Sequence, residues 1–454
     1  MPEGADDPDT TRALVRSTNY VTWRRQGGWD PMVVVRAKDS TFWDDRGNAY
    51  LDFSSQLMAT NLGHGNEAVV EAIVRQARAL PYAAPGFATP ARADLSRALL
   101  GVLPKGLDRF FYSTSGTEAN EAALKIARVA TGRPKIVSRH RSYHGATAAS
   151  ISVTGDFRRR PVEGLQTVPG TVFAPDCYCY RCPFGLTYPS CHVACAEYVD
   201  DLLECEGNVA AMIVEPVVGT NGVLVPVPEY LPRLREITRR HDVLLIADEV
   251  MTGWGRVGAW FGVDRWGVQP DLLTTAKGIT GAYVPLGLTA TTAALHDLFR
   301  DRYFPHGHTY EAHPLTLAPA VAAISEYRRL DLVAKSRRDG DYLLARLREI
   351  AARHPSVGDV RGLGLFAAVE LVRDRTSRTP FNDGEDKLAG RPLVAERVAA
   401  AMLKEGVYCV AWLSHLVIAP PLIVTRDELD RGLEALDRAL AVADDAVAPG
   451  PPSA

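Results

Sequence analysis

The stretch LLIADEVMTGWGRVG, residues 244–258, begins as an apolar run and continues into acidic residues and a glycine-rich turn. Such an apolar run is typical of a central strand in a parallel sheet, because that strand is buried on both faces. Side chains alternate along a strand, so we expect Asp248 and Val250 on one side and Glu249 on the other. A buried carboxylate beside a branched apolar side chain suits a flat heteroaromatic cation. The alternative is an acid that only caps the next loop.

Outward from this stretch, short apolar runs alternate with helical patterns. We expect strands at residues 109–113, 135–138, 210–218, 243–250 and 271–276, and helices at 117–130 and 228–241. This alternation predicts βαβ units and a mostly parallel sheet covered on both faces. The predicted fold class is therefore α/β.

The pattern of charged and apolar residues changes near residue 326. The C-terminal part combines charged helices at 333–354 and 393–405, a strand at 365–371 and an amphipathic helix from 426 to about 444. Near the N-terminus, residues 41–55 have the aromatic and turn spacing of a hairpin. We expect a disordered tail at 1–10, an N-terminal segment of a small domain at 11–60, a large domain at 61–325, the rest of the small domain at 326–446 and a disordered tail at 447–454.

Composition argues against several classes of protein. The 454 residues carry 51 Lys and Arg against 54 Asp and Glu, a net charge of -3. No basic surface for nucleic acid or an anionic membrane is expected from this balance. No apolar run approaches the roughly 20 residues that span a bilayer. The N-terminus MPEGADDPDT does not resemble a secretory signal, so a cytoplasmic protein is expected.

Five of the seven cysteines fall between Cys177 and Cys195, in the pattern C-x-C-x2-C-x8-C-x3-C with His192 inside it. In a cytoplasmic chain, such a cluster indicates free thiols or a metal site before disulfides. The spacing is compatible with zinc, so the residues alone leave both open.

A candidate nucleophile lies in TTAKGITG, residues 274–281, where Lys277 follows a predicted buried strand and precedes a glycine turn. A desolvated lysine amine loses its proton readily. A lysine that merely extends from a strand end into solvent is the alternative.

An anion-binding turn is predicted by YSTSGTEANEAALKIAR, residues 112–128. A strand runs into Ser115, Gly116 and Thr117 and then into a helix, whose first turn offers free N–H groups and a favourable dipole. Ser and Thr also cap many helices that bind nothing. In SYHGAT, residues 142–147, the aromatic Tyr143 stands just before another glycine turn after a strand.

Taken together, these four motifs indicate one ligand site. A phosphate cradle, a stacking aromatic, an acid for a ring nitrogen and a nucleophilic lysine follow one another at strand ends of an α/β sheet, where ligands bind.

The strings STSGTEAN, SYHGAT, VEP, IADEVMTGWGRVG, TTAKGITG and HGHTYEAHP resemble the class III (ω-amino acid) aminotransferases, which are pyridoxal-phosphate enzymes of fold type I. The resemblance extends from about Tyr20 to Asp430. Through LDFSSQL, NLGHG, CYRCPFGLT and IVEPVVGTNG the chain is most similar to taurine–pyruvate and β-alanine–pyruvate aminotransferases. The resemblance implies pyridoxal 5′-phosphate as cofactor, a large domain with a mostly parallel sheet, a smaller α+β domain from both termini, and a homodimer with shared active sites.

Carried over by motif, the resemblance implies that Lys277 is the Schiff-base lysine and proton shuttle, and that Asp248 pairs with the pyridinium nitrogen. Val250 would pack on one ring face and Tyr143 on the other. Glu215 would lie near the cofactor edge.

The phosphate would be bound by Ser115, Gly116 and Thr117, and by Thr309 from a second subunit. Because the family needs no metal for catalysis, packed free thiols are favoured for the cysteine cluster, and no metal is expected.

Four positions depart from the family pattern. Glu311 and Ala312 stand where a small residue and a glycine are expected, which puts a charge beside the phosphate-side loop. Val410, counted back from Ala419-Pro420-Pro421, replaces an arginine with which many members bind a substrate carboxylate. Met58 stands where amine-specialised relatives often carry an aromatic residue.

The candidate substrate residues are Trp29, Met58, Phe87 and Val410. Without an arginine at position 410, glutamate and 2-oxoglutarate are expected to be poor substrates, because a buried carboxylate needs a cation. Other residues that could supply one are Arg139, Arg141, Arg256 and His415.

The expected reaction moves an amino group from an ω-amino acid or amine, such as taurine or β-alanine, to a small keto acid such as pyruvate, in a ping-pong cycle through pyridoxamine phosphate. An amino-acid racemase or epimerase on the same scaffold is the alternative, because the fold does not fix the reaction. A pyridoxal-phosphate-binding regulator is disfavoured, since no DNA-binding segment precedes the catalytic part and no basic patch is present.

Overall fold

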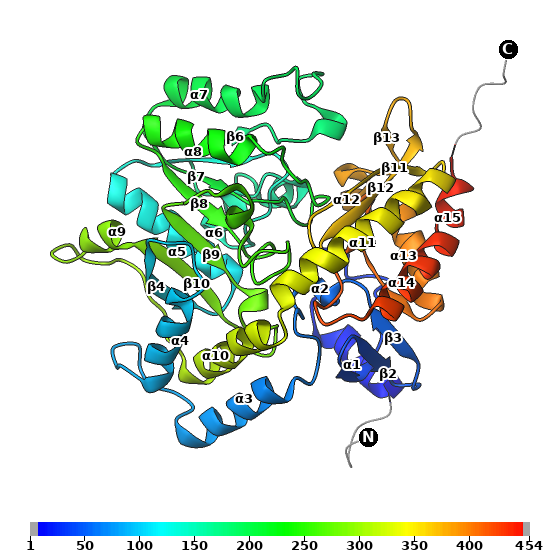
Figure 1. The fold of residues 1–454 in the computed structure, drawn as a ribbon, viewed down its shortest axis with the longest axis horizontal. Helices are drawn as coiled ribbons and strands as arrows, with labels where there is room; N and C mark the ends of the chain where they lie inside the picture. The colour runs from blue at the N-terminus through cyan, green and yellow to red at the C-terminus, as the bar shows by residue number, and fades with distance from the viewer. Residues whose placement is uncertain (1–7, 448–454) are drawn as a thin grey trace.

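The computed structural model describes residues 8–447, which form three sheets and their covering helices (Figure 1). The largest sheet has seven strands in the order β4-β10-β9-β8-β7-β5-β6. Their bounds are β4 Leu107–Ser113, β5 Lys135–Arg139, β6 Thr171–Ala174, β7 Val209–Val214, β8 Leu244–Asp248, β9 Leu272–Thr275 and β10 Gly287–Thr292.

Strand direction in this sheet agrees with the sequence prediction. The pairs β5–β6, β5–β7, β7–β8 and β8–β9 are parallel, and β10 alone runs against its neighbours β9 and β4. All six residues of β7 are buried, so the sheet is covered on both faces. The mostly parallel α/β architecture is confirmed.

The helices of this part of the chain lie before, between and after these strands in sequence. They are α3 Glu67–Ala79, α4 Pro90–Leu100, α5 Gly116–Thr131, α6 Ala148–Ser152, α7 Ala194–Glu206, α8 Tyr230–Arg240, α9 Ala293–Asp297 and α10 Pro314–Arg329, with short 3₁₀ turns η1 Phe157–Val162, η2 Cys179–Arg181, η3 Gly262–Trp266 and η4 Lys277–Ile279. Helix α5 packs across five strands, which explains its row of buried alanines. Its end at Gly132 has φ +69°, a conformation that glycine adopts without strain.

Two smaller sheets lie on the right of Figure 1 and draw on both ends of the chain. One has the order β1-β2-β3-β14, and the other has the order β11-β12-β16-β15 with β13 paired to β12. Their strands are β1 Val34–Lys38, β2 Thr41–Asp44, β3 Ala49–Asp52, β11 Val357–Gly362, β12 Ala367–Asp374, β13 Thr379–Pro380, β14 Val407–Tyr408, β15 Val410–Trp412 and β16 His415–Ile418. The parallel β3–β14 pair joins the N-terminal and C-terminal segments, and β2–β3 is the expected hairpin.

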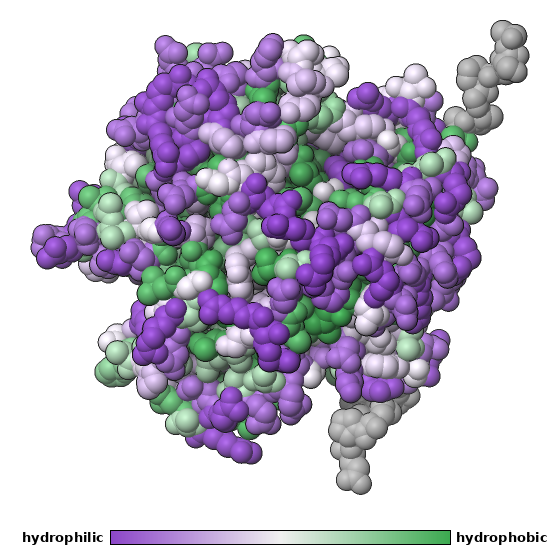
Figure 2. All heavy atoms as spheres, viewed as in Figure 1, coloured by the Kyte–Doolittle hydropathy of each residue, from purple (hydrophilic) through white to green (hydrophobic). Residues whose placement is uncertain are grey.

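The remaining helices surround these sheets. They are α1 Pro8–Thr18, α2 Ser55–Met58, α11 Leu332–Arg353, α12 Gly384–Ala389, α13 Val394–Lys404, α14 Arg426–Ala439 and α15 Ala441–Asp444. Helix α11 crosses the middle of Figure 1 between the large sheet and the C-terminal helices. In the view of Figure 2, hydrophilic residues cover the side of these C-terminal helices, and hydrophobic residues gather toward the centre. No helix in residues 8–447 is long and apolar enough to cross a membrane.

Several expected boundaries differ from the structure. Residues 8–10 begin helix α1 instead of lying in a disordered tail, because Asp9 in the first turn pairs with Arg12 one turn on. The other tail residues, 1–7 and 448–454, lie outside the described range, and Val447 ends it. The boundary at 325/326 falls inside α10, which packs on α3 and α4 and ends near Asp331, where φ is +48°.

Two strands are shorter than expected. Strand β8 ends at Asp248, because the Asp248 carboxylate accepts a hydrogen bond from the backbone N–H of Val250 at 3.0 Å and turns the chain. Val250 therefore follows the strand instead of sharing it, although it still lines the same cavity as Asp248. Strand β7 ends at Val214, just before Glu215 and Pro216, because proline cannot continue a ladder of hydrogen bonds.

The guanidinium of Arg256 joins all these parts. It is fully buried, and it donates to the Leu365 and Pro420 carbonyls at 2.9 and 2.6 Å. It also donates to Ser55 Oγ at 3.0 Å and to Asn61 Oδ1 at 2.7 Å. Burial without a carboxylate partner lowers the pKa of Arg256 to about 10. One side chain thus holds the N-terminal segment, the loop after β8 and the C-terminal segment together.

Replacing Arg256 by methionine should lower the free energy of unfolding by about 3 kcal/mol or more, because four acceptors lose their donor inside the protein. Urea unfolding followed by circular dichroism measures the change. The matched control is Arg348→Met on the exposed face of α11, which should stay within about 0.5 kcal/mol of the parent. Equal stability of the two variants would contradict a joining role for Arg256.

Candidate active site

A cavity of about 270 Å³ lies at the carboxyl ends of the central strands. The structure brings ten of the predicted residues together around it: Met58, Ser115, Gly116, Thr117, Tyr143, Glu215, Asp248, Val250, Lys277 and Val410. Ligands bind at this edge of open α/β sheets, because chain crossovers leave a crevice there. Each of these residues except Met58 and Val410 follows a strand of the large sheet.

Lys277 follows β9 and opens the short turn η4 with φ +47°, a backbone conformation that L-residues rarely adopt. Such strain is tolerated where the surrounding structure fixes the chain, and it often marks a functional site. Burial lowers the pKa of Lys277 to about 8, against the opposing pull of Asp248 and Glu215. A substantial fraction of this amine is therefore neutral and nucleophilic near neutral pH.

Asp248 ends β8, and its carboxylate contacts the side chains of Asn120 and His144. Its Oδ2 accepts a hydrogen bond from Asn120 Nδ2 at 2.8 Å and lies 2.7 Å from His144 Nδ1. Thr274 in turn donates to Asn120 Oδ1 at 2.6 Å. The carboxylate is 3% exposed, so its position in the cavity wall is fixed by hydrogen bonds and not by solvent.

Glu215 fixes the loop that carries Tyr143. Its Oε1 accepts from the Tyr143 backbone N–H at 3.0 Å, and its Oε2 accepts from the Gly219 N–H at 2.8 Å. Burial raises the pKa of Glu215, with a further contribution from the Asp248 charge. Burial also raises the pKa of the Tyr143 hydroxyl. The tyrosine ring is thereby presented to the cavity as a neutral flat surface.

The N-terminus of α5 faces the same space. Ser115 caps the helix by accepting from the Glu118 N–H at 3.2 Å, and Glu118 in turn accepts from Thr114 Oγ1 at 2.6 Å. A Cβ at Gly116 would lie 2.8 Å from a methyl carbon of Val250. Only glycine therefore lets the helix start come this close to Val250, and together they form a narrow wall of the cavity.

Sequence reasoning missed ten residues that line the cavity, among them Trp23, Asn120, His144, Arg158 and Trp412. Asn120 and His144 stand inside the strings STSGTEAN and SYHGAT, so their neighbours were already recognised. Arg158 has no motif signal and is brought in by the turn η1, and Trp412 comes from β15, remote in sequence. Trp23 comes from the loop between α1 and β1.

Three predicted residues do not line this cavity. Trp29 is half-buried elsewhere, and Phe87 is 67% exposed. The part of Trp29 and Phe87 in substrate binding stays a prediction. Thr309 is exposed, and its carbonyl accepts a hydrogen bond from the Tyr82 hydroxyl at 3.1 Å.

The cations named as substitutes for an arginine at position 410 lie elsewhere. Arg139 is buried and donates to the Glu215 carbonyl, and Arg256 lies in the joint between segments. Arg141 and His415 line a separate cavity of about 500 Å³. In the part of the chain that the structure describes, the lysine and arginine side chains around the candidate site are Lys277 and Arg158.

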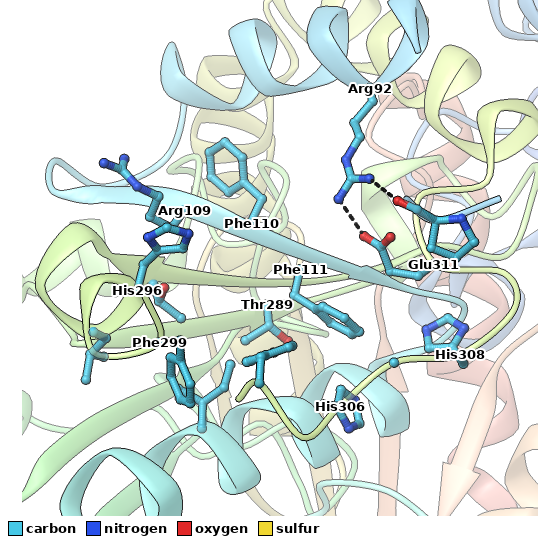
Figure 3. Close-up of a pocket in the computed structure, with 16 residues that line it drawn as sticks. Arg92, Arg109, Phe110, Phe111, Thr289, His296, Phe299, His306, His308 and Glu311 are labelled. Atoms are coloured by element: carbon cyan, nitrogen blue, oxygen red, sulfur yellow. Dashed lines mark hydrogen bonds and ion pairs between the residues drawn. The ribbon is translucent and has the colours of Figure 1, made fainter. Parts of the chain in front are cut away.

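A further, larger cavity of about 550 Å³ contains none of the predicted site residues. Figure 3 shows Phe110 and Phe111 of β4 on one wall and His306 and His308 on the loop that leads to Thr309. It includes Glu311, the first of the two departures in this loop.

The structure explains the departures from the family pattern at residues 311 and 312. Glu311 is buried and accepts a hydrogen bond from Arg92 Nη2 at 3.0 Å, drawn as a dashed line in Figure 3. Burial raises the pKa of Glu311, while the Arg92 charge opposes that shift. Ala312 has φ +52°, the left-handed conformation in which glycine would be free of strain. The loop thus keeps the conformation that the family pattern requires, with an ion pair fixing its charged residue.

All seven cysteines are free thiols. Five of them line a small cavity of about 20 Å³ beside η2. In residues 8–447, no group of three or more His, Cys, Asp or Glu side chains is arranged to hold a metal ion.

Comparison with known proteins places this geometry among the transaminases. The family model for class-III aminotransferases matches residues 24–440. A leucine/methionine racemase of Thermococcus litoralis is 35% identical, covering 90% of this chain and 91% of that protein. A taurine–pyruvate aminotransferase of Rhodobacter capsulatus is 34% identical, covering 90% and 92%. The solved structure of a taurine:2-oxoglutarate aminotransferase from Bifidobacterium kashiwanohense superposes with a TM-score of 0.92 at 32% identity, covering 98% of this chain and 100% of that one.

The lowered pKa of Lys277 predicts how its reactivity depends on pH. In the cofactor-free protein, acetylation of Lys277 by acetic anhydride should increase about tenfold per pH unit up to pH 8 and then level off. Peptide mass spectrometry after brief labelling between pH 6 and 11 measures it. The Lys277→Arg variant, whose matching peptide cannot be labelled at this position, controls the peptide assignment. A rise that continues to the ordinary value of 10.5 would contradict the desolvated environment.

Proposed function

Because the chain belongs to the class-III aminotransferases, we propose that it transfers an amino group from a short ω-amino acid, taurine or β-alanine, to pyruvate. The enzyme is a pyridoxal-phosphate-dependent transaminase, as the family is. The proposal rests on one observation. The desolvated Lys277 and the buried Asp248 line the same cavity at the carboxyl edge of the sheet.

The residues of the cavity fit pyridoxal phosphate. Gly116 leaves a slot that a Cβ would fill, between the start of α5 and Val250. Tyr143 offers a flat surface, and Asp248 offers a carboxylate whose surroundings hold it in place. A flat ring with one protonated nitrogen and one phosphate matches these three features.

When bound, the cofactor supplies an aldehyde that takes up the amino group and a pyridine ring that withdraws electrons from the substrate. Lys277 would hold the cofactor through its aldehyde, and its amine, when free, would accept and return the proton that the transfer moves. Its neutral fraction near pH 8 suits both roles, because a base must be unprotonated to accept a proton.

Asp248 would keep a ring nitrogen protonated, since a buried carboxylate stabilises an adjacent positive charge. Val250 and Tyr143 would pack against the ring. Glu215 acts at the cofactor edge through the loop that it fixes.

The N–H groups and hydroxyls at Ser115, Gly116 and Thr117 would hold the phosphate, because the dipole of α5 favours a negative charge there. Thr309 would complete this site from a second subunit. The exposure of Thr309 and its distance from its own cavity agree with such a role, which requires a homodimer.

The acceptor is proposed to be pyruvate and not 2-oxoglutarate. Val410 gives the cavity an apolar wall where an arginine would bind a second carboxylate. Apart from Lys277, Arg158 is the only lysine or arginine that residues 8–447 place around the cavity. Pyruvate has one carboxylate to pair and 2-oxoglutarate has two, so the latter would leave one unpaired at a cost of several kcal/mol.

The half-reaction tests the proposed function. Holoenzyme mixed with taurine or β-alanine alone should convert its cofactor stoichiometrically to pyridoxamine phosphate, which absorbance and chromatography detect. L-leucine and L-methionine form the second arm, because one relative is a racemase of these amino acids. Racemisation of either amino acid, without cofactor conversion by any donor, would overturn the aminotransferase proposal.

For acceptor choice, kcat/KM for pyruvate should exceed that for 2-oxoglutarate by about a hundredfold or more with one shared donor, as expected for an unpaired buried carboxylate. The matched variant is Val410→Arg, which should narrow this ratio by improving 2-oxoglutarate. A parent ratio near one would show that the cavity pairs both carboxylates.

A further inference from the structure

The strained turn at Lys277 needs a support that the roles assigned so far do not supply. Lys277 has φ +47° and opens η4, a 3₁₀ turn of only three residues. Its own carbonyl accepts long hydrogen bonds, from the Thr280 N–H at 3.3 Å and the Ala282 N–H at 3.2 Å. A lysine in this conformation relaxes to a more common one unless its surroundings prevent it. The neighbours of the turn therefore determine where the amine points.

The hydroxyl of Tyr327 binds this turn from helix α10. It donates to the carbonyl of Gly278, the residue after Lys277, at 2.7 Å. Inside the turn, the same carbonyl accepts from the Gly281 N–H at 3.1 Å, so both of its lone pairs are used. In residues 8–447, no other side chain donates a hydrogen bond to the backbone of residues 276–279. The hydroxyl thus ties the turn to a helix outside the sheet.

Tyr327 is itself held in one position. The residue is fully buried, and its ring centre lies 6.2 Å from those of Trp254 and of Trp260. Rings packed in this way leave a side chain little freedom. Burial raises the pKa of the Tyr327 hydroxyl, so the oxygen keeps its proton and stays a donor near neutral pH. The hydrogen bond to Gly278 therefore starts from a rigid group.

Asn61 contacts the same turn in another direction. A Cβ at Gly278 would lie 2.7 Å from Asn61 Nδ2 and 2.7 Å from Trp254 Cβ, which leaves no room for a side chain. Asn61 Nδ2 donates to the Trp254 carbonyl at 3.1 Å, and Asn61 Oδ1 accepts from Arg256 Nη2 at 2.7 Å. The turn is therefore held between α10 and a side chain that the joint at Arg256 fixes.

We propose that Tyr327 is a positioning residue for Lys277, because its hydroxyl, together with the contact of Asn61, fixes the turn that directs the amine into the cavity. The inference rests on the proposed function, in which this amine holds the cofactor and, when free, moves a proton. A base accepts a proton effectively only while it stays within reach of the atom that carries that proton. A turn held in this way returns the free amine to the same place in every cycle.

The first test uses Tyr327→Phe, which removes the hydroxyl and keeps the ring. In the cofactor-free protein, the pH midpoint of Lys277 acetylation should rise by about one unit from the parent value of about 8, because a loosened turn lets water reach the amine. Peptide mass spectrometry after brief labelling with acetic anhydride measures the midpoint. The matched control is Tyr342→Phe, which removes a hydroxyl that donates to Asp430 between α11 and α14. Its midpoint should stay within about 0.2 unit of the parent.

The second test uses the holoenzyme and the donor that the parent converts. In Tyr327→Phe, the rate constant of the half-reaction should fall about tenfold, while KM changes less than about threefold, because the hydroxyl touches no substrate. Gly278→Ala disturbs the turn independently, since the new Cβ would press on Asn61 and Trp254. It should change the acetylation midpoint and the rate constant in the same directions. Urea unfolding establishes that each variant is folded.

The outcomes separate the two proposals. A parent enzyme that converts no donor defeats the proposed function, while the acetylation profiles of the cofactor-free variants still test Tyr327. Unchanged midpoints in folded Tyr327→Phe and Gly278→Ala would overturn the inference. A loss of rate that Tyr342→Phe shares would overturn it as well, since such a loss reports general stability and not the turn.

Discussion

The buried guanidinium of Arg256 is the constraint on which the rest of the structure depends. It makes hydrogen bonds to Ser55 and Asn61 of the N-terminal segment and to carbonyls of the C-terminal segment, and it has no carboxylate partner. A cation in that position is stable only if every acceptor is in place, so it links the position of each segment to that of the others. The loop that carries Arg256 begins at Asp248. The same chain turn therefore fixes both the centre of the site and the joint beside it.

The candidate site follows from this arrangement as a balance of charges in a space that water scarcely enters. Desolvation acts against the Lys277 ammonium, while Asp248 and Glu215 favour it. The result is an amine with a pKa of about 8, which can change between the protonated and the neutral state near neutral pH. The guanidinium of Arg158 lies over the rings of Tyr143 and Trp412 and adds a positive charge that also lowers the pKa of Lys277.

Much of the fold could be predicted from the sequence, since the periodicity of apolar runs reports burial directly. The buried strand at 244–248 and the helix ending at Gly132 are examples, because each depends on residues next to one another. The site residues that follow strands could be found for the same reason. Arg158, Trp412 and Trp23 could not, because they reach the cavity from a short turn, a distant strand and a loop. Contacts between remote segments leave no local pattern. The division into domains and the roles of the site residues remain predictions.

The parallel pairing of β3 with β14 also sets an order of events during protein synthesis. Strand β3 ends at Asp52, while its partner begins at Val407, near the end of the chain. At the 5–20 residues per second typical of translation, the N-terminal hairpin waits roughly 20 to 70 seconds for that partner to leave the ribosome. Met58 is synthesised near the start of this interval and Val410 at its end. The part of the cavity wall that both residues form is therefore closed only then. A nascent chain that ends before β14 therefore carries Lys277 and Asp248 without the part of the cavity wall that Val410 supplies.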